Sequence, residues 1–182
     1  IGGQFAPLTE SQQAINAVSA FHGTDFDAIN NELRYDKPDI YADVIAELDK
    51  ISKDLTDDTL YRGFDANYVK MLADKYGIKD LDNILDLQKL VGKTITDKGF
   101  TSTSRMLHIA ADFARDKGLG KTMVMQLSGK KRGIDVLNYL TNLRAKKEKE
   151  FILKRGSSIV IKKVSLSKTK KIIIYADTLW ST

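Results

Sequence analysis

The sequence predicts an α+β fold in which a helical N-terminal half packs on a strand-rich C-terminal half. Apolar residues recur at helical spacing before Gly92, and runs of valine and isoleucine with alternating polar residues dominate after it. Regular alternation of strand and helix is missing, which argues against a doubly wound sheet and favours a largely antiparallel or mixed sheet. We expect one domain over residues 1–182, with a helical part at about 1–58 and a core at about 59–179.

The N-terminal half contains three predicted helices before its first strand. Thr9 or Ser11 is expected to cap the first helix, because both side chains can accept a hydrogen bond from the first turn. Asp25 precedes the second helix, and Pro38 is expected to begin the third. The other elements predicted in this half are a short strand at 60–64 and helices at 67–76 and 81–90, ended by Gly77 and Gly92.

The C-terminal half is expected to be mostly extended. A helix is predicted at 107–113, where the spacing of apolar residues is again helical. Met123 and Met125 alternate on a predicted strand and are expected to fill the core. The extended segments predicted in this half lie at 93–104, 122–127, 134–137, 148–153, 158–164 and 172–176.

The composition excludes several kinds of protein. The 182-residue chain has no cysteine, so disulfides, thiolate metal sites and a cysteine nucleophile are ruled out. No apolar run approaches the roughly 18 residues of a membrane span, and no signal peptide is visible. The two histidines, His22 and His108, are too separated to indicate a zinc site, and core or surface roles are expected for both. We therefore expect no metal.

The charge is unevenly distributed around a net value of +5. Residues 1–100 carry 11 Lys/Arg and 18 Asp/Glu, whereas residues 101–182 carry 18 and 6. A basic half can attract phosphate, nucleic acid or an acidic protein surface, although a solubilising surface explains any single lysine as well. The basic clusters at 130–132 and 146–147 are predicted in loops. They lack interleaved aromatic residues that stack on bases, so nucleic acid is the less favoured partner.

Two glutamates lie two positions apart in Glu148-Lys149-Glu150. On a strand, side chains two apart point to the same face, so both carboxylates would project together while Lys149 points away. Like charges this close repel, which destabilises the strand unless a cation or a ligand compensates. The alternative is an exposed, charged beginning of a strand after the basic segment 144–147.

Two further segments carry polar groups on predicted strands. The three hydroxyls of the Ser-Thr-Ser segment 102–104 could orient a nearby carboxylate or bind a ribose. In Tyr61-Arg62-Gly63, the planar guanidinium of Arg62 suits a diphosphate, and Gly63 would let a ligand approach the backbone. Taken separately, the hydroxyls could lie on the solvent face of a strand, and Arg62 could form a surface salt bridge with Asp65.

In this order, the segments Tyr61-Arg62-Gly63, Ser102-Thr103-Ser104 and Glu148-Lys149-Glu150 resemble the Arg–Ser–Glu class of mono-ADP-ribosyltransferases, in particular the clostridial-type bacterial toxins. The resemblance runs from about Phe21 to Leu179. It includes the helical segment 29–34, and Phe113-Ala114-Arg115 falls where the family has a phenylalanine and a basic residue. The resemblance implies an ADP-ribosyltransferase-like fold with a two-sheet core that binds NAD. It also implies that the chain transfers ADP-ribose from NAD to a protein side chain and releases nicotinamide.

The resemblance also implies a role for each matching residue. Arg62 would hold the NAD diphosphate, and Ser102 would orient Glu150. Glu150 would hydrogen-bond the ribose and stabilise the positive charge that develops as the glycosidic bond breaks. Glu148 would bind the acceptor and help to deprotonate it. The remaining residues implied to contact or support NAD are Asn30, Arg34, Gly63, Thr103, Ser104 and Phe113.

The acceptor and the setting follow from the same resemblance. In this family a glutamate at the first position of the pair goes with arginine acceptors, and a glutamine there goes with asparagine or with Rho targets. Glu148 therefore implies an arginine-specific enzyme. The basic segment 141–147, which presents the target protein in the family, favours a target with an acidic surface.

The resemblance makes the chain a toxin or a phage or bacterial effector domain. If the domain is a toxin, we expect it to be secreted or delivered into a target cell with the help of a partner or a fused domain. If it is not a toxin, we expect it to be cytoplasmic. Two alternatives stay open. One is a NAD glycohydrolase without a macromolecular acceptor, and the other is a non-catalytic docking module of the same fold.

Overall fold

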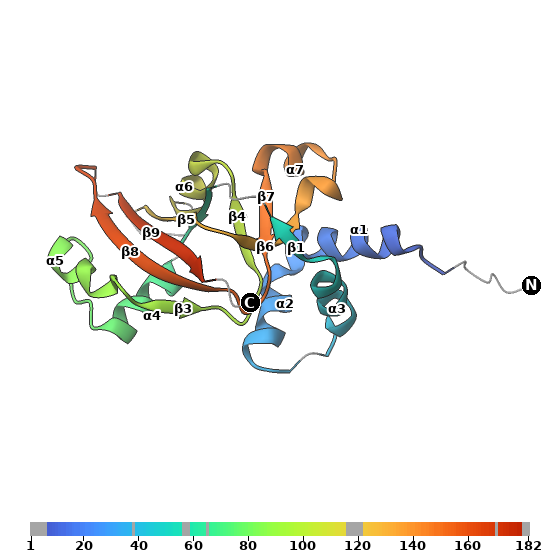
Figure 1. Cartoon of the computed structure of the whole chain (residues 1–182), viewed down its shortest axis with the longest axis horizontal. Helices are drawn as coiled ribbons and strands as arrows, with labels where there is room; N and C mark the ends of the chain where they lie inside the picture. Colours follow the sequence, from blue (N-terminus) through green and yellow to red (C-terminus); the bar gives the residue numbers. More distant parts are fainter. Residues whose placement is uncertain are drawn as a thin grey trace, which may run out of the picture.

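The chain forms a mixed sheet with helices beside its two ends and along its middle. The computed structural model describes residues 7–37, 39–55, 59–64, 66–115, 122–169 and 171–179. Figure 1 shows α1 and α3 beside one end of the sheet and α4 and α5 beside the other. The α+β prediction, with helices in the N-terminal part, is therefore confirmed.

The first helix begins at a reciprocal cap. The Thr9 hydroxyl accepts a hydrogen bond from the Gln12 backbone at 3.2 Å, and the Gln12 side chain accepts one from the Thr9 backbone at 3.0 Å. Of the two predicted caps, Thr9 is the one used. Pro38, predicted to begin the third helix, lies outside the described residues. The N-terminal helices are α1 (Glu10–Ala20), α2 (Phe26–Arg34) and α3 (Ala42–Ile51).

Nine strands of the described residues follow the order β1-β6-β7-β4-β2-β5-β9-β8-β3. All neighbouring strands are antiparallel except β5 and β9, which are parallel, so the sheet is mixed as predicted. The strands are β1 (Lys53–Leu55), β2 (Leu60–Gly63), β3 (Thr94–Thr96), β4 (Thr101–Ser104), β5 (Met123–Ser128), β6 (Lys131–Asp135), β7 (Glu150–Leu153), β8 (Ser158–Leu166) and β9 (Ile172–Leu179).

The predicted two-sheet core needs one correction, because the strands are hydrogen-bonded into a single sheet. Strand β2 is the link, since it pairs with β4 on one edge and with β5 on the other. Its register with β5 runs from Leu60 to Gly63, whereas its register with β4 consists of the pair Tyr61↔Ser104. The two halves of the sheet therefore meet at a narrow β2–β4 junction.

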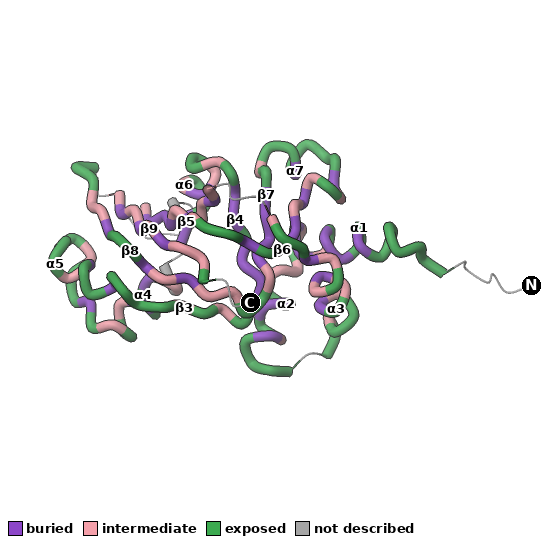
Figure 2. Tube along the Cα trace, viewed as in Figure 1, coloured by how far each residue is buried: buried purple, intermediate pink, exposed green. Residues whose placement is uncertain are grey.

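Two hydrophobic cores pack against the sheet. One cluster packs α4 and α5 against β2, β5, β8, β9 and one face of β7, and it includes Met123 and Met125 as predicted. The other packs α1, α2 and α3 against β6 and β7. Figure 2 shows the buried stretches along the central strands and the exposed stretches along the outer turns and helices.

The later helices agree with the prediction in part. Helices α4 (Ala66–Tyr76) and α6 (Leu107–Arg115) lie where they were predicted. The helix predicted at 81–90 is shorter: α5 covers Ile84–Leu87, and a 3₁₀ turn covers Gln88–Leu90. Helix α7 (Leu143–Glu148) and a 3₁₀ turn at Val136–Asn138 were not predicted. Among the described residues, the helices are too short or too polar to cross a bilayer.

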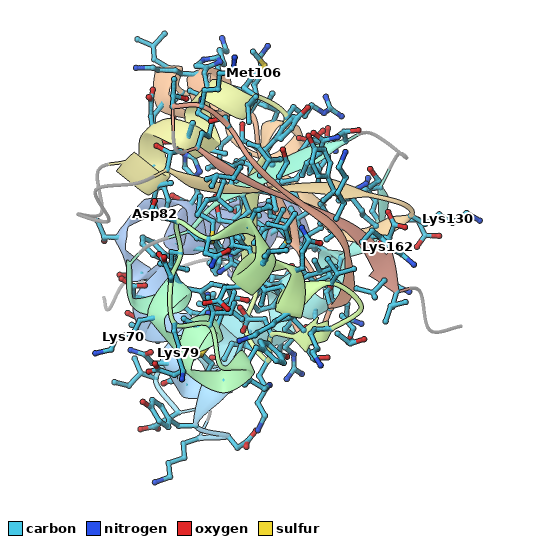
Figure 3. All side chains as sticks on the ribbon, turned by 90° about the vertical axis from the view of Figure 1, so that its left-hand side faces the viewer. Lys70, Lys79, Asp82, Met106, Lys130 and Lys162 are labelled. Carbon is cyan, nitrogen blue, oxygen red and sulfur yellow. The ribbon has the colours of Figure 1, made fainter. Side chains whose placement is uncertain are left out.

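Of the two basic clusters, Lys130 lies in a loop as predicted, whereas the other four residues lie in β6 and α7. Lys131 is a buried residue of β6, and its ammonium group donates a hydrogen bond to the Gly129 carbonyl at 2.6 Å. Lys146 and Lys147 belong to the last turn of α7, where a positive charge interacts favourably with the negative end of the helix dipole. Figure 3 shows Lys70 and Lys79 on one side of the molecule and Lys130 and Lys162 on the opposite side, so lysine side chains extend from opposite faces.

Gly63 is required for packing, a reason that was not predicted for this glycine. A Cβ at this position would lie 2.0 Å from the Ala110 carbonyl oxygen and 2.9 Å from the Ala114 nitrogen, both backbone atoms of α6. Side chains of real residues do not make such contacts. The missing side chain lets α6 lie directly on β2, which places the N-terminal part of α6 beside the cleft described below.

We expect Gly63→Ala to lower the free energy of unfolding by about 3 kcal/mol, because neither backbone segment of α6 can move without disturbing the core. The measurement is urea unfolding followed by circular dichroism. Gly156→Ala is the matched control: its Cβ would meet open space, but its φ of +75° is unfavourable for alanine, at a cost of about 1 kcal/mol. Equal losses in the two variants would contradict the steric explanation.

Candidate active site

A cleft of about 1200 Å³ opens where the two halves of the sheet meet. Its lining comes from β2, β4 and β7, from α2, α4, α6 and α7, from the connection between α1 and α2, and from β3 with the residues that follow it. The structure brings together all the residues that were predicted for the site. Those lining the cleft are Asn30, Arg34, Arg62, Gly63, Ser102, Thr103, Ser104, Phe113, Glu148 and Glu150.

The Glu150 carboxylate is held at both of its oxygen atoms. Glu150 is the first residue of β7, and only 7% of it is exposed. The Ser102 hydroxyl donates a hydrogen bond to Oε2, as predicted from the family resemblance. His22 Nδ1 lies 2.8 Å from Oε1. Two short contacts from different elements leave this carboxylate little freedom to rotate.

Glu148 does not lie on the strand, which corrects the predicted strand at 148–153. It is the last residue of α7, and Lys149 follows in the left-handed conformation with φ 45°. This turn, rather than the alternation of a strand, brings Glu148 to the same side as Glu150. The Glu148 carboxylate accepts a hydrogen bond from Arg144 Nε at 2.9 Å and lies 3.7 Å from His22 Nδ1.

The other two hydroxyls of the Ser-Thr-Ser strand hold the turn in place. Thr103 donates a hydrogen bond to the Phe151 carbonyl at 2.8 Å, which supports the pairing of β4 with β7. Ser104 donates one to the Glu148 carbonyl at 2.6 Å and accepts one from the Met106 backbone at 3.1 Å. The backbone between the two glutamates is therefore fixed from β4.

Arg62 lines the cleft from β2. Its guanidinium carbon is 4.9 Å from the ring centroid of Tyr68 and 5.6 Å from that of Phe64, and these two rings stack on each other. Nη1 donates a hydrogen bond to the Thr101 hydroxyl at 3.5 Å. The alternative partner Asp65 lies outside the described residues. The aromatic packing sets the plane of the guanidinium while leaving it in the cleft.

Asp97 joins the two arginines of the cleft. It accepts two hydrogen bonds from Arg34, at 3.3 and 3.1 Å, and lies 3.8 Å from Arg62 Nη1. Burial opposes ionisation of Asp97, but the hydrogen bonds from Arg34 and the Gly99 backbone, together with the charge of Arg62, outweigh it and lower its pKa. Asp97 therefore keeps both guanidinium groups at one place in the cleft.

The remaining predicted residues differ in how exposed they are to solvent. Asn30 is buried, and its side-chain amide donates to the Phe100 carbonyl at 2.9 Å and accepts from the Phe100 backbone at 2.8 Å. In this structure it ties α2 to the beginning of β4. Phe113 is 46% exposed on α6 and faces the cleft. The side chain of Arg115 lies outside the described residues.

Sequence reasoning missed two residues of the site, His22 and Asp97. His22 was assigned a core or surface role, whereas its ring contacts both glutamates. Its hydrogen bond with Glu150 raises the pKa of His22 above the ordinary value, burial opposes this rise, and the charges of both glutamates add to it. The sequence did contain an indication of this role, because the paired carboxylates of Glu148 and Glu150 require a neighbouring cation, and a histidine can supply one. In the described part of the chain, no cluster of acidic or histidine side chains could hold a metal ion.

Comparison with solved structures places the fold among ADP-ribosyltransferases. The C3 exoenzyme of Clostridium limosum has 20% sequence identity and a TM-score of 0.65, covering 92% of this chain and 85% of that chain. A C3-type protein of S. aureus, solved with NAD, has 19% identity and a TM-score of 0.64 over 98% and 99% of the two chains. An ADP-ribosyltransferase of Clostridium botulinum has 19% identity and a TM-score of 0.63 over 98% of both chains.

The family follows from the sequence match. Residues 4–181 match the ADP-ribosyltransferase exoenzyme family, and the chain belongs to that family. The comparison with curated proteins gave no match. The predicted relationship to bacterial ADP-ribosylating toxins is therefore confirmed, together with the fold.

Proposed function

We propose that this chain cleaves NAD at the bond between nicotinamide and ribose and transfers the ADP-ribose to an arginine of a target protein. The observation that carries the proposal is the polarity of the cleft. In its lining, Arg34 and Arg62 gather around Asp97, whereas Glu148 and Glu150 gather around His22. NAD has the matching polarity, since its diphosphate is anionic and its nicotinamide ribose becomes cationic as the bond breaks.

The dimensions of the cleft fit this substrate. Its volume of about 1200 Å³ exceeds the roughly 300–1,000 Å³ usual for small-molecule sites and suits an extended dinucleotide. Arg62 would bind the diphosphate with its planar fork, and Arg34 would add a second positive charge. Phe113 would pack near the nicotinamide, with Thr103 and Ser104 supporting the same pocket. In this proposal Asp97 holds the arginines ready for the diphosphate.

The chemical step uses charge already placed in the site. The bond between C1′ of the ribose and the nicotinamide nitrogen breaks, and its electron pair leaves with nicotinamide. Glu150 would accept a hydrogen bond from the ribose and stabilise the positive charge on the sugar. An acceptor nitrogen then forms the new bond to C1′ and loses its proton to Glu148.

The contact between Arg144 and Glu148 supports an arginine as the acceptor. The guanidinium of Arg144 donates to the Glu148 carboxylate at 2.9 Å, and about a third of that carboxylate side chain is exposed at the cleft. Glu148 therefore accommodates a guanidinium in this structure, and a charge-assisted bond of this kind is stronger than a neutral one. The basic face of α7 beside it favours an acidic target surface. As an exoenzyme, the chain would act on a protein of a target cell.

We expect Glu148→Gln to reduce transfer to an arginine analogue by about 10²-fold, because the amide cannot take up the acceptor proton. The slower hydrolysis of NAD should change much less, since Glu150 and Ser102 are retained. The measurement is the incubation of labelled NAD with agmatine and chromatography of the products. Labelled agmatine from the unaltered chain supports a transferase, and release of free ADP-ribose alone would support the glycohydrolase alternative.

If the unaltered chain binds NAD but does not cleave it, the docking module is the better description. Titration of the unaltered chain with NAD distinguishes this outcome from a chain that does not bind NAD at all. Equal losses of transfer and hydrolysis in Glu148→Gln would contradict the separate roles given to the two glutamates. Mass spectrometry of a lysate treated with the chain and NAD then locates the modified side chain of the target.

A further inference from the structure

His22 lies where the first two helices join. The segment Phe21–Asp25 forms a π-helical turn, and Gly23 has a ψ of −119° that no helix contains. Such irregular turns redirect a side chain from the course that a straight helix would give it. Here His22 points into the fold, with 4% of its side chain exposed, and takes part in lining the cleft.

The contacts of His22 help to hold the Glu150 carboxylate in one orientation. Nδ1 lies 2.8 Å from Glu150 Oε1, while Ser102 binds the other oxygen. Each carboxylate oxygen has two lone pairs, so these two bonds leave acceptor sites for a ribose hydroxyl. A carboxylate fixed at both oxygens needs no reorganisation when positive charge develops on the sugar.

The surroundings of His22 link its charge to the two glutamates. The charged groups that face it are Glu150 on β7 and Glu148 and Arg144 on α7. The two carboxylates favour the imidazolium, whereas Arg144 and burial disfavour it. Its other nitrogen, Nε2, is buried without a hydrogen-bond partner among the described residues, which adds a cost to the protonated form. The positive charge on His22 therefore depends mainly on Glu150.

We propose that His22 is a positioning residue that fixes the Glu150 carboxylate toward the ribose and balances the charge of the Glu148–Glu150 pair. This role rests on the proposed function. It supplies the cation that two neighbouring carboxylates require. It also makes cleavage of NAD depend on a proton that does not itself enter the reaction.

The sign of the pH dependence follows from the raised pKa of His22. Below that pKa the imidazolium makes a charge-assisted bond to Glu150, and above it a weaker neutral bond remains. We expect kcat for NAD cleavage to fall about fivefold as pH rises through this pKa, which corresponds to roughly 1 kcal/mol. The KM for NAD should stay within about twofold, because the two arginines bind the diphosphate independently of this proton.

Two variants of His22 separate positioning from simple structural support. His22→Asn keeps an N–H donor near the place of Nδ1 but cannot become charged, and His22→Phe keeps the ring but cannot donate. We expect His22→Asn to have a low kcat without the pH step, so that its rate meets that of the unaltered chain at high pH. His22→Phe should be slower at every pH. A pH step that persists in His22→Asn would overturn the proposal.

A measurement without NAD distinguishes failure of this inference from failure of the proposed function. The titration of His22 is followed by NMR in the unaltered chain, Glu150→Gln and Glu148→Gln, with the exposed His108 as the internal reference. The pKa of His22 should fall in both variants. It should fall further in Glu150→Gln, because His22 Nδ1 lies 2.8 Å from the Glu150 carboxylate and 3.7 Å from that of Glu148. An unchanged titration in Glu150→Gln would overturn the inference even if NAD is cleaved.

Discussion

Glu150→Gln is expected to lower the rate of NAD cleavage by about 10²- to 10³-fold, as loss of a preorganised electrostatic contact does in other enzymes. Glutamine has the shape of glutamate and can still accept a hydrogen bond from Ser102. It carries no charge, however, and so cannot balance the cationic sugar in the transition state. The measurement is single-turnover release of labelled nicotinamide, with and without agmatine.

The control for this variant is Glu10→Gln, which removes one negative charge from α1. The Glu10 side chain is 90% exposed and lies 3.9 Å from Lys50, away from the cleft residues. Its rate should equal that of the unaltered chain. A Glu150→Gln variant that is folded by circular dichroism and still cleaves NAD within tenfold of the normal rate would remove Glu150 from the reaction.

Arg62→Met is expected to lower kcat/KM for NAD by about 10³-fold, mainly through a higher KM. Two charge-assisted hydrogen bonds to the diphosphate, at about 2 kcal/mol each, account for this loss. Methionine keeps the apolar packing against Tyr68 and Phe64, so the cleft wall should remain in place. Isothermal titration with NAD measures the binding directly, and initial rates give the separation of kcat from KM.

Arg155→Met is the matched control for the loss of an arginine. Arg155 pairs with Asp49 at 2.7 Å and is absent from the cleft lining. Its binding of NAD should be unchanged, whatever the effect on stability. If Arg62→Met binds NAD as tightly as this control, the diphosphate does not lie at Arg62, and Arg34 becomes the alternative.

The sequence predicted the order of the elements well because their signals are local. Glycine stops, the Thr9 cap and the change of hydrophobic period all act within a few residues. Helix α7 was missed because its cap, Asn142 accepting from the Ala145 backbone at 2.8 Å, lies in a stretch that reads as a charged loop. Glu148 was consequently placed on a strand. The conclusion that both carboxylates face the cleft was reached for the wrong geometric reason.

The site residues matched by a family motif could be predicted, and those held only by distant contacts could not. His22 is 128 positions from Glu150, and Asp97 is 63 positions from Arg34. No spacing rule connects such pairs, because the fold alone brings them together. The packing role of Gly63 could not be predicted either, because it depends on α6, whose backbone lies against this glycine only in the folded chain.

The narrow β2–β4 junction has a consequence for how substrate and fold stabilise each other. Arg62 belongs to the half of the sheet beyond β2, and Glu150 belongs to the half beyond β4, with the pair Tyr61↔Ser104 as the ladder contact between them. A dinucleotide held at both residues would span this junction as an additional non-covalent tie. Bound NAD should therefore raise the thermal unfolding temperature of the whole chain and slow amide exchange in β2 and β4 more than in strands remote from the junction.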